Sequence, residues 1–251
     1  MIKTEWDYSE LASFYDKRAD YAQDSIKMIA DRVGLNKETL VCDIGAGTGK
    51  LTIQLAKYGS QIYAIEPNDN MRKYGVNNTL NINNVKWFEG TGEHTGMTEN
   101  TFDLVTFGSS FNVCNRILAL EESFRILKHG GIFVCLWNHR VLDNPIQKDI
   151  ESILRKNIQG YSHGVRRENQ RSIIENSGLF EDITESTYEF NVIKSKMEFA
   201  EAWYSDATVK RQSGEQFTTI CEQIKSYLDS INYDKINIPY TTKVWIAKKK
   251  G

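Results

Sequence analysis

The chain has 251 residues, 40% of them hydrophobic and 25% charged, and its formal net charge is −2. This composition is typical of a globular protein and excludes wholesale disorder, and the balanced charge argues against a protein that coats nucleic acid. No apolar run approaches the ~18–20 residues needed to cross a bilayer, and the first seven residues hold no apolar leader core. We therefore expect a cytoplasmic monomer or homodimer with no membrane partner and, on its charge, no nucleic-acid partner.

The first half of the chain predicts alternating helices and strands. Residues 8–33 carry apolar side chains at helical spacing, and Gly34 is a signal that ends a helix. Helical stretches also begin near residues 50 and 70 and cover 117–127. The expected strands are 40–44, 61–66, 84–88, 102–107 and 132–137. Such alternation predicts βαβ units, a parallel sheet and right-handed crossovers.

The pattern changes in the last third of the chain. The expected elements are a helix at 167–177, a strand at 183–191, a mostly helical stretch at 194–230 and a closing strand at 241–247. A terminal pair of strands interrupted by helices predicts a lid built onto the core. We expect one domain, made of a helical cap at 1–35, a core at 36–190 plus 240–249, and a substrate lid at 138–164 and 191–239.

The four cysteines are widely spaced and include no C-x-x-C pair. No histidine lies close enough to them in sequence to form a zinc knuckle. Most of them lie in or beside apolar runs, where a free thiol behaves as a small hydrophobe. Because no cluster of metal-binding acids is visible either, we expect the protein to need no metal.

Residues 41–49 (VCDIGAGTG) are the most informative segment, a short strand with an acid near its end followed by alternate glycines. Glycine permits positive φ and lets a ligand approach the backbone closely. A Walker loop is excluded because Ile44 replaces its first glycine and Leu51 its Mg²⁺-binding hydroxyl. A dinucleotide fingerprint fits at its first two glycines but has Lys50 in place of the third. What remains is G-x-G-x-G preceded two residues earlier by Asp43.

This turn and four further motifs resemble the class I, Rossmann-like S-adenosylmethionine-dependent methyltransferases, in their small-molecule branch. The motifs lie in the family's order at 41–49, Glu66, 90–93, 102–105 and 127–133. Two positions depart from the usual pattern, Gly92 where alanine is common and His129 where proline is common. The resemblance implies an α/β fold with a seven-stranded, mostly parallel sheet, helices on both faces, an antiparallel last strand, a helical cap and a helical lid insertion.

The resemblance also implies S-adenosyl-L-methionine as the cofactor and S-adenosyl-L-homocysteine as its product. Asp43 is placed to meet the ammonium group, and Glu66 can accept both ribose hydroxyls. Arg18 and Tyr21 of the cap are candidates to hold the methionine carboxylate, or else a surface arginine and a core tyrosine. The other residues expected at the cofactor are Gly45, Ala46, Gly47, Gly49, Pro67, Asn68, Met71, Gly92, Glu93, His94, Phe107 and Gly108.

Methyl transfer from a sulfonium is an in-line displacement in which the protein mainly aligns the two partners and excludes water. A hydroxyl acceptor benefits from a general base, whereas a neutral amine or a carboxylate needs none. We expect His139 to be that base, because it follows the fifth strand at the edge that faces the ligand crevice. The alternative is a histidine that bonds a loop carbonyl. His163 is the reserve candidate.

The acceptor residues are expected at the end of the fourth strand and in the lid. They are Ser109, Phe111, Asn112, Arg140, Tyr161, His163, Arg166, Arg167, Trp203 and Tyr204. Arginine guanidinium groups suit a carboxylate or phosphate ligand, although a run of charged residues can also be the solvent-exposed face of a helix. We expect O-methylation of a small molecule, an anionic, phosphorylated, sugar or capsule-precursor metabolite.

Two alternative functions remain open. An RNA or protein methyltransferase is disfavoured by the acidic balance and by residues 108–111 (GSSF), which stand where such enzymes often carry an Asn-Pro-Pro-Tyr type motif. A non-catalytic regulator that binds S-adenosylmethionine would keep the same glycine turn and acids, so cofactor binding alone does not separate it from an enzyme.

Overall fold

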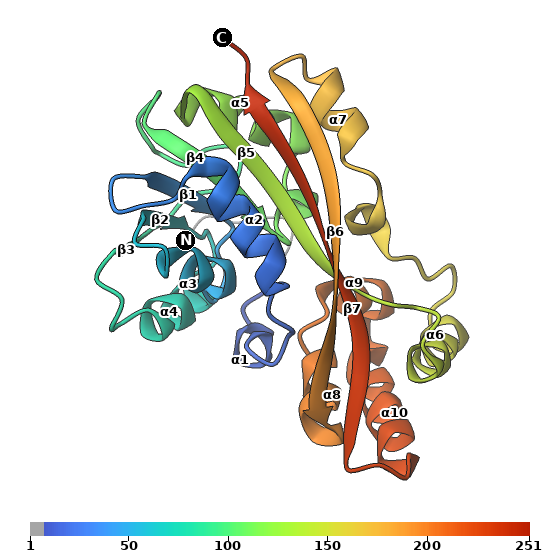
Figure 1. The fold of residues 1–251 in the computed structure, drawn as a ribbon. Coiled ribbons are helices and arrows are strands. Elements are labelled where there is room, and N and C mark those ends of the chain that lie inside the picture. The colour runs from blue at the N-terminus through green and yellow to red at the C-terminus, as the bar shows by residue number, and fades with distance from the viewer. Residues whose placement is uncertain (1–7) are drawn as a thin grey trace.

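The computed structural model describes residues 8–251, so residues 1–7, with the start of the predicted cap and the segment searched for a leader, lie outside the described part. One seven-stranded sheet has the order β3-β2-β1-β4-β5-β7-β6 (Figure 1). The strands are β1 (Leu40–Ile44), β2 (Gln61–Ile65), β3 (Val85–Phe88), β4 (Phe102–Gly108), β5 (Leu127–Arg140), β6 (Phe180–Ser195) and β7 (Lys235–Lys249).

The first five strands pair in parallel, and β7 is antiparallel to both of its neighbours. The chain runs outward from β1 through β2 to β3 and then crosses to β4 on the other side of β1. This reversal is a topological switch point, where ligands bind at the carboxyl ends of the strands. The expected Rossmann-like sheet, mostly parallel with an antiparallel last strand, is therefore confirmed.

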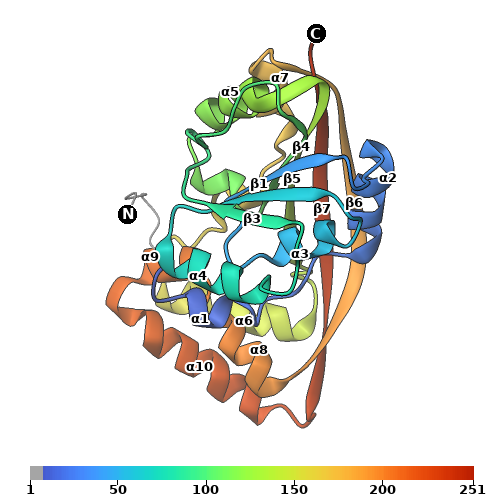
Figure 2. The same ribbon diagram turned by 90° about the vertical axis from the view of Figure 1, so that its left-hand side faces the viewer.

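Helices cover both faces of the sheet. Successive side chains of β1 point to opposite faces, and those on each face pack with different helices. Val41 packs with Ile29 of α2 and Leu55 of α3, whereas Cys42 belongs to the cluster that contains Leu120 of α5. Figure 2 shows α2 and α5 on opposite sides of the strands. The helices are α1 (Ala12–Tyr15), α2 (Gln23–Val33), α3 (Lys50–Ala56), α4 (Asp69–Asn78), α5 (Arg116–Ile126), α6 (Pro145–Asn157), α7 (Arg171–Asn176), α8 (Lys196–Trp203), α9 (Ala207–Ser213) and α10 (Phe217–Ser230), with 3₁₀ turns η1 (Phe111–Val113), η2 (Gly164–Arg167) and η3 (Gly214–Gln216).

The region expected to form a lid, called the lid below, has a hydrophobic core of its own. Ile150 and Leu154 of α6 pack with Phe199 of α8 and Ile224 of α10, apart from the two clusters on the faces of the sheet. Figure 1 shows β6 and β7 continuing past the other strands into the lid, where α8 and α10 lie along them. The expected boundaries at 190 and 240 fall inside this ladder, because Phe190 pairs with Tyr240. Two continuous strands thus connect the core to the lid.

The structure differs from the expected elements mainly where long-range pairing extends a strand. β5 continues to Arg140, because residues 132–140 pair without interruption with 240–248 of β7. β6 and β7 are likewise longer than their alternating patterns indicated. The helix α6 was not expected at all, although Asn144 caps it by accepting a hydrogen bond from the Gln147 N–H, with Pro145 in its first turn.

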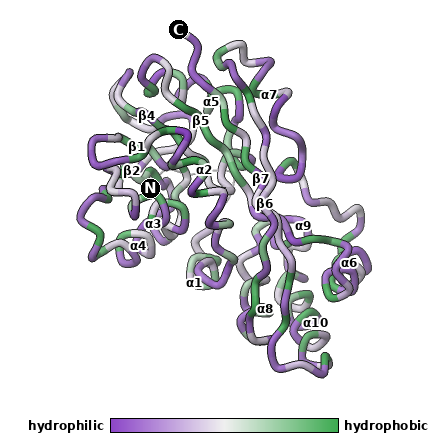
Figure 3. The backbone as a smooth tube through the Cα atoms, in the orientation of Figure 1, coloured by the Kyte–Doolittle hydropathy of each residue, from purple (hydrophilic) through white to green (hydrophobic). Residues whose placement is uncertain are grey.

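Hydropathy follows this architecture. Figure 3 shows hydrophobic colour along the central strands and hydrophilic colour on many outer turns. No helix within residues 8–251 is long and apolar enough to cross a membrane.

Candidate active site

The turn after β1 brings its backbone against the loop after β4. Gly45 and Gly47 have φ values of 65° and 60°, in the left-handed region that favours glycine. A Cβ atom on Gly45 would lie 2.4 Å from the Cβ atom of Ser110. Ser110 is held in place, because its hydroxyl donates to the Ile44 carbonyl at 2.6 Å. Glycine at position 45 thus satisfies both the backbone angle and the close approach.

Asp43 is fully buried beneath this turn. The Thr52 hydroxyl donates to Oδ2 at 2.6 Å, and the Thr106 hydroxyl donates to Oδ1 at 2.8 Å. Burial raises the pKa of Asp43 to about 6, against the lowering effect of the two threonines. The helix α3 and the strand β4 therefore fix this carboxyl group in one orientation.

Glu66, directly after β2, is the second buried acid at the switch point. The Gly47 N–H donates to Oε2 and the Asn68 N–H donates to Oε1, both at 2.9 Å. Burial raises the pKa of Glu66 to about 7, although these two hydrogen bonds act to lower it. Each carboxylate oxygen keeps further lone-pair capacity, so the group can also accept two hydroxyl donors from a ligand.

A cavity of about 580 Å³, called here the wide cavity, lies over Glu66 and the glycine turn. Its size is within the usual range for sites that hold a small molecule or cofactor. Tyr8 and Tyr15 of the amino-terminal segment close part of it. The expected site residues that line it are Gly45, Gly47, Glu66, Pro67, Asn68, Met71, Gly92, Glu93, Ser109 and Asn112.

A second cavity of about 90 Å³, the narrow cavity, lies between the glycine turn and the lid. It shares Tyr15, Gly45, Gly47 and Ser109 with the wide cavity, so the two meet at the turn and at the end of β4. The expected site residues that line only the narrow cavity are Arg18, Tyr21, Asp43, Ala46, Gly108, His139, Arg140, Tyr161, His163, Arg166, Arg167 and Trp203.

Ser109 has a strained backbone at the place where the cavities meet. Its φ of 59° is uncommon for a residue with a side chain, and such strain often marks functional sites. The Ser109 N–H donates to the Leu136 carbonyl at 2.8 Å, and its hydroxyl lies 3.0 Å from the Tyr21 hydroxyl. These two contacts hold the end of β4 in its unusual conformation.

The other expected site residues line neither cavity within residues 8–251. Phe107 and Phe111 are buried with ring centroids 5.3 Å apart, and Gly49 precedes α3 with a φ of 88°. His94 is exposed, and Tyr204 packs among lid aromatics. The positions of these residues in the core, at a helix start and on the surface explain why they line neither cavity.

His139 is a weaker base than its position after the fifth strand suggests. Its Nε2 atom lies 3.0 Å from the Arg166 carbonyl oxygen, to which the neutral ring donates. Burial, followed by the charge of Arg167, lowers the pKa of His139 to about 3. The sequence alone shows neither the burial nor the arginines that cause this shift of the His139 pKa. The contact with a loop carbonyl is the alternative role that the sequence left open.

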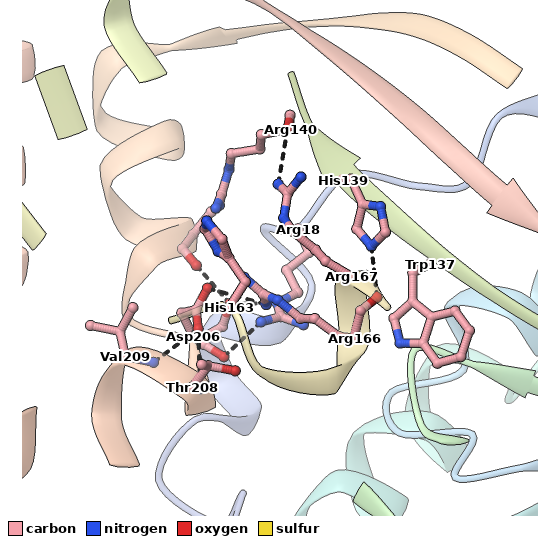
Figure 4. Close-up of polar contacts among 12 residues, drawn as sticks. Arg18, Trp137, His139, Arg140, His163, Arg166, Arg167, Asp206, Thr208 and Val209 are labelled. Carbon is pink, nitrogen blue, oxygen red and sulfur yellow. Dashed lines mark hydrogen bonds and ion pairs between the residues drawn. The ribbon is translucent and has the colours of Figure 1, made fainter. Parts of the chain in front are cut away.

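Arginines gather around Asp206 at the lid end of the narrow cavity (Figure 4). Asp206 is the residue directly before α9, where its side chain accepts hydrogen bonds from the Thr208 and Val209 N–H groups at 3.1 Å. The Nη1 atom of Arg166 lies 3.6 Å from its Oδ2 atom. Burial opposes ionisation of Asp206, but Arg166, Arg18 and Arg140 outweigh it and lower the pKa to about 2. Asp206 is therefore the buried counterion of the cluster.

Arg18 connects the cap to the lid. Its Nε–H and Nη2–H groups donate to the side chain and the carbonyl of Ser205 at 2.9 and 3.1 Å. Its Nη1–H group donates to the Tyr15 hydroxyl at 3.1 Å. Arg18 lines the narrow cavity and carries these three contacts in addition to its electrostatic interaction with Asp206.

Sequence reasoning missed several residues of the narrow cavity, among them Gln147, Glu151 and Asp206. Gln147 and Glu151 are spaced to lie on one face of α6, so recognition of that helix could have paired them. Asp206 directly before Ala207 was a readable helix-capping signal. Within residues 8–251, no group of three or more His, Cys, Asp or Glu side chains is arranged to hold a metal ion.

The departure at Gly92 has a packing reason. A Cβ atom there would lie 2.5 Å from the Cys114 sulfur and 3.3 Å from the Phe107 ring. The side chains of the loop after β4 thus fill the space that an alanine methyl would need. The thiol of Cys114 lines the wide cavity, and burial raises its pKa to about 12, so it is a neutral packing group.

The structure has a parallel sheet with its switch point beside β1, a glycine turn there, and buried acids at the ends of β1 and β2, as the resemblance to class I methyltransferases implies. Residues 42–135 match the family model described as a methyltransferase domain.

The chain is similar to known proteins in sequence and in structure. Demethylmenaquinone methyltransferase from Staphylococcus aureus is 35% identical over 114 residues, which are 44% of this chain and 47% of that protein, so the match spans about half of the relative's length. The YcgJ protein from Bacillus subtilis superposes with a TM-score of 0.57 at 15% identity, covering 92% of this chain and 100% of that one.

A third similar protein has been solved with its ligands. Phosphoethanolamine N-methyltransferase 2 from Haemonchus contortus, in complex with phosphomonomethylethanolamine and S-adenosylhomocysteine, superposes with a TM-score of 0.54 at 18% identity. The match covers 91% of this chain and 53% of that one. At these identities the solved structures establish the fold alone.

Proposed function

We propose that the protein transfers a methyl group from S-adenosylmethionine to an oxygen atom of a small anionic acceptor. One observation supports a negative charge on the acceptor. The Nε atoms of Arg166 and Arg167 are buried at the narrow cavity and have no hydrogen-bond partner within residues 8–251. Burial and the neighbouring Arg166 lower the pKa of Arg167 to about 10. A bound carboxylate or phosphate would satisfy both guanidinium groups and offset their repulsion.

The balance of charge in the narrow cavity supports an anion. Its lining includes five cationic side chains against three acids, one of which, Asp43, has a raised pKa. The cations are Arg18, Lys50, Arg140, Arg166 and Arg167. The volume of about 90 Å³ favours a compact molecule over a polymer strand. In this proposal, residues 138–164 and 191–239 form the substrate lid.

The residues at the wide cavity fit the nucleoside part of the cofactor. Glu66 would hold the ribose hydroxyls, because its buried carboxylate has lone pairs left after bonding Gly47 and Asn68. Asp43 and the glycine turn would hold the amino-acid part. When bound, the cofactor supplies an electrophilic methyl group on a sulfonium. The chain's own residues align the acceptor at Ser109 and exclude water through the lid.

Replacing Glu66 with alanine should weaken binding of S-adenosylhomocysteine by about 1.5–3 kcal/mol, because a charged hydrogen-bond acceptor is lost. Donation from ribose hydroxyls favours the ionised carboxylate, whose pKa is about 7 in the free protein. Wild-type affinity should therefore rise between pH 6 and pH 8, and less so in the variant. Calorimetry measures both. Glu99→Ala, at an exposed acid outside both cavities, is the control, and equal affinities would contradict the assignment of Glu66.

The proposed function is tested by binding and then by transfer. Calorimetry should show binding of S-adenosylmethionine and not of NAD, and a preference for NAD would overturn the proposal. Labelled methyl should then pass to 4-hydroxybenzoate or glycerol 3-phosphate in preference to phenol or glycerol. Equal or better transfer to the neutral members of these pairs would contradict an anionic acceptor.

A further inference from the structure

Three polar side chains of the lid meet at the narrow cavity without satisfying one another. Gln147 and Glu151 lie one turn apart on the buried face of α6, and His163 precedes η2. The Nε2 atom of His163 is 3.3 Å from Oε2 of Glu151. Its Nδ1 atom is 3.5 Å from the Tyr161 hydroxyl, at the outer limit of a hydrogen bond.

Four buried polar atoms of this group have no hydrogen-bond partner of good geometry in the described part of the chain. They are both amide atoms of Gln147, Oε2 of Glu151 and Nε2 of His163. Gln147 is 0% exposed, so bulk water does not supply the hydrogen bonds that its amide group lacks. Buried polar groups are nearly always paired, and catalytic contacts are often long until the substrate is bound. Because Oε2 of Glu151 and Nε2 of His163 lie 3.3 Å from each other, the two amide atoms of Gln147 are the ones that indicate a bound ligand with both donor and acceptor atoms.

We propose that His163 is the general base of the methyl transfer, that Glu151 is its positioning residue, and that Gln147 bonds the acceptor; this inference rests on the proposed function. An ionised carboxylate only accepts hydrogen bonds, so Glu151 pairs with the Nε2–H group. The lone pair then resides on Nδ1. The contact of this atom with the Tyr161 hydroxyl, at 3.5 Å, is at the outer limit of a hydrogen bond. This is the arrangement of an oriented histidine base.

The step balances without any further reactant. The acceptor oxygen forms a bond to the methyl carbon while its O–H bond breaks and the proton passes to Nδ1 of His163. The carbon–sulfur bond breaks with its electron pair remaining on sulfur, which becomes a neutral thioether. Glu151 stabilises the imidazolium, which releases its proton to solvent when the product leaves.

His139 lines the same cavity but is less suited to this role. Its Nε2–H group is committed to the Arg166 carbonyl, and its pKa is lowered to about 3. His163 has a carboxylate beside it, whereas His139 faces arginines. Of the ionisable groups near His163, Glu151 and Tyr161 contact it and Arg155 of α6 pairs with Glu151. Arg166 and Arg167 of η2, Arg140 of β5 and Asp206 before α9 line the same cavity.

The test compares variants with 4-hydroxybenzoate as acceptor and labelled S-adenosylmethionine as donor. His163→Gln should lower kcat by ~10²–10⁴-fold while the affinity for S-adenosylhomocysteine stays unchanged. The acidic limb of the wild-type pH–rate profile should disappear in this variant. Glu151→Gln should lower kcat by less than His163→Gln does. His129→Gln, at an exposed histidine of β5, is the matched control.

Nitrogen NMR of the protein bound to S-adenosylhomocysteine tests the geometry without any acceptor. His163 should be the Nε2–H tautomer, and Glu151→Gln should abolish that preference. The Nδ1–H tautomer in the wild type, or wild-type kcat in His163→Gln, would overturn the inference. Both results leave the proposed function standing if the cofactor binds, whereas absence of cofactor binding to the wild type refutes the proposed function itself.

Discussion

Replacing Asp206 with alanine should lower the free energy of unfolding by about 3–5 kcal/mol, the usual cost of removing one partner from a buried charge pair. Asp206 is 2% exposed and lies 3.6 Å from the guanidinium of Arg166, with Arg18 and Arg140 also lowering its pKa. Without its carboxylate, three guanidinium groups repel one another beneath the lid. Urea denaturation measures the change from the shift in midpoint.

Asp206→Asn separates the charge from the helix cap. Asparagine caps helices as well as aspartate does, so the contacts to Thr208 and Val209 survive and only the charge is lost. Asn144→Ala, which removes only a cap from α6, should cost about 1 kcal/mol and is the matched control. Wild-type unfolding free energy in Asp206→Asn would show that the arginines need no counterion.

The pH dependence gives a second measurement on the same pair. The pKa of Asp206 is about 2 in the folded protein and 3.8 in the unfolded chain. A lowered folded pKa contributes stability that is complete above the unfolded value and is lost as pH falls through the folded value. The difference between wild type and Asp206→Asn should therefore be constant above pH ~4 and shrink toward pH ~2.

The proposed cofactor half of the site could be predicted from the sequence because its signals are local. Asp43 and Gly45 lie two residues apart, and Glu66 follows a five-residue strand of plain apolar character. Such short patterns determine a strand, a turn and an acid at its end whatever the rest of the chain does. The fold class followed from the same alternation of strands and helices, and the sheet order confirms it.

The proposed acceptor half was harder to predict from the sequence because its chemistry depends on burial and on contacts across the chain. His139 was an attractive base in sequence, yet burial and nearby arginines lower its pKa to about 3. Asp206 interacts with Arg18 and Arg166, which lie far from it in the sequence. Neither the missing hydrogen bonds of Gln147 nor the proximity of Glu151 to His163 leaves a periodic signal in the sequence.

Gly45→Ala should both destabilise the protein and impair cofactor binding. A residue with a side chain pays roughly 1–2 kcal/mol to adopt a left-handed conformation, and crowding in a packed region costs about 1–3 kcal/mol more. Gly34→Ala isolates the first cost, because Gly34 has a φ of 71° but nothing within 4 Å of its missing Cβ atom. Denaturation should show a clearly larger loss for Gly45→Ala than for Gly34→Ala.

The second cost is tested by relieving the clash. The nearest atom to the added methyl group is the Cβ atom of Ser110, at 2.4 Å, so Ser110→Gly removes it whereas Ser110→Ala does not. The double variant Gly45→Ala/Ser110→Gly should therefore lose less free energy of unfolding than the two single variants lose together. A double-mutant cycle measures this coupling. Additive losses would mean that backbone conformation alone requires glycine at position 45. Positive coupling, with affinity for S-adenosylhomocysteine partly restored, would show that the close approach of the β1 turn to the β4 loop shapes the cofactor site.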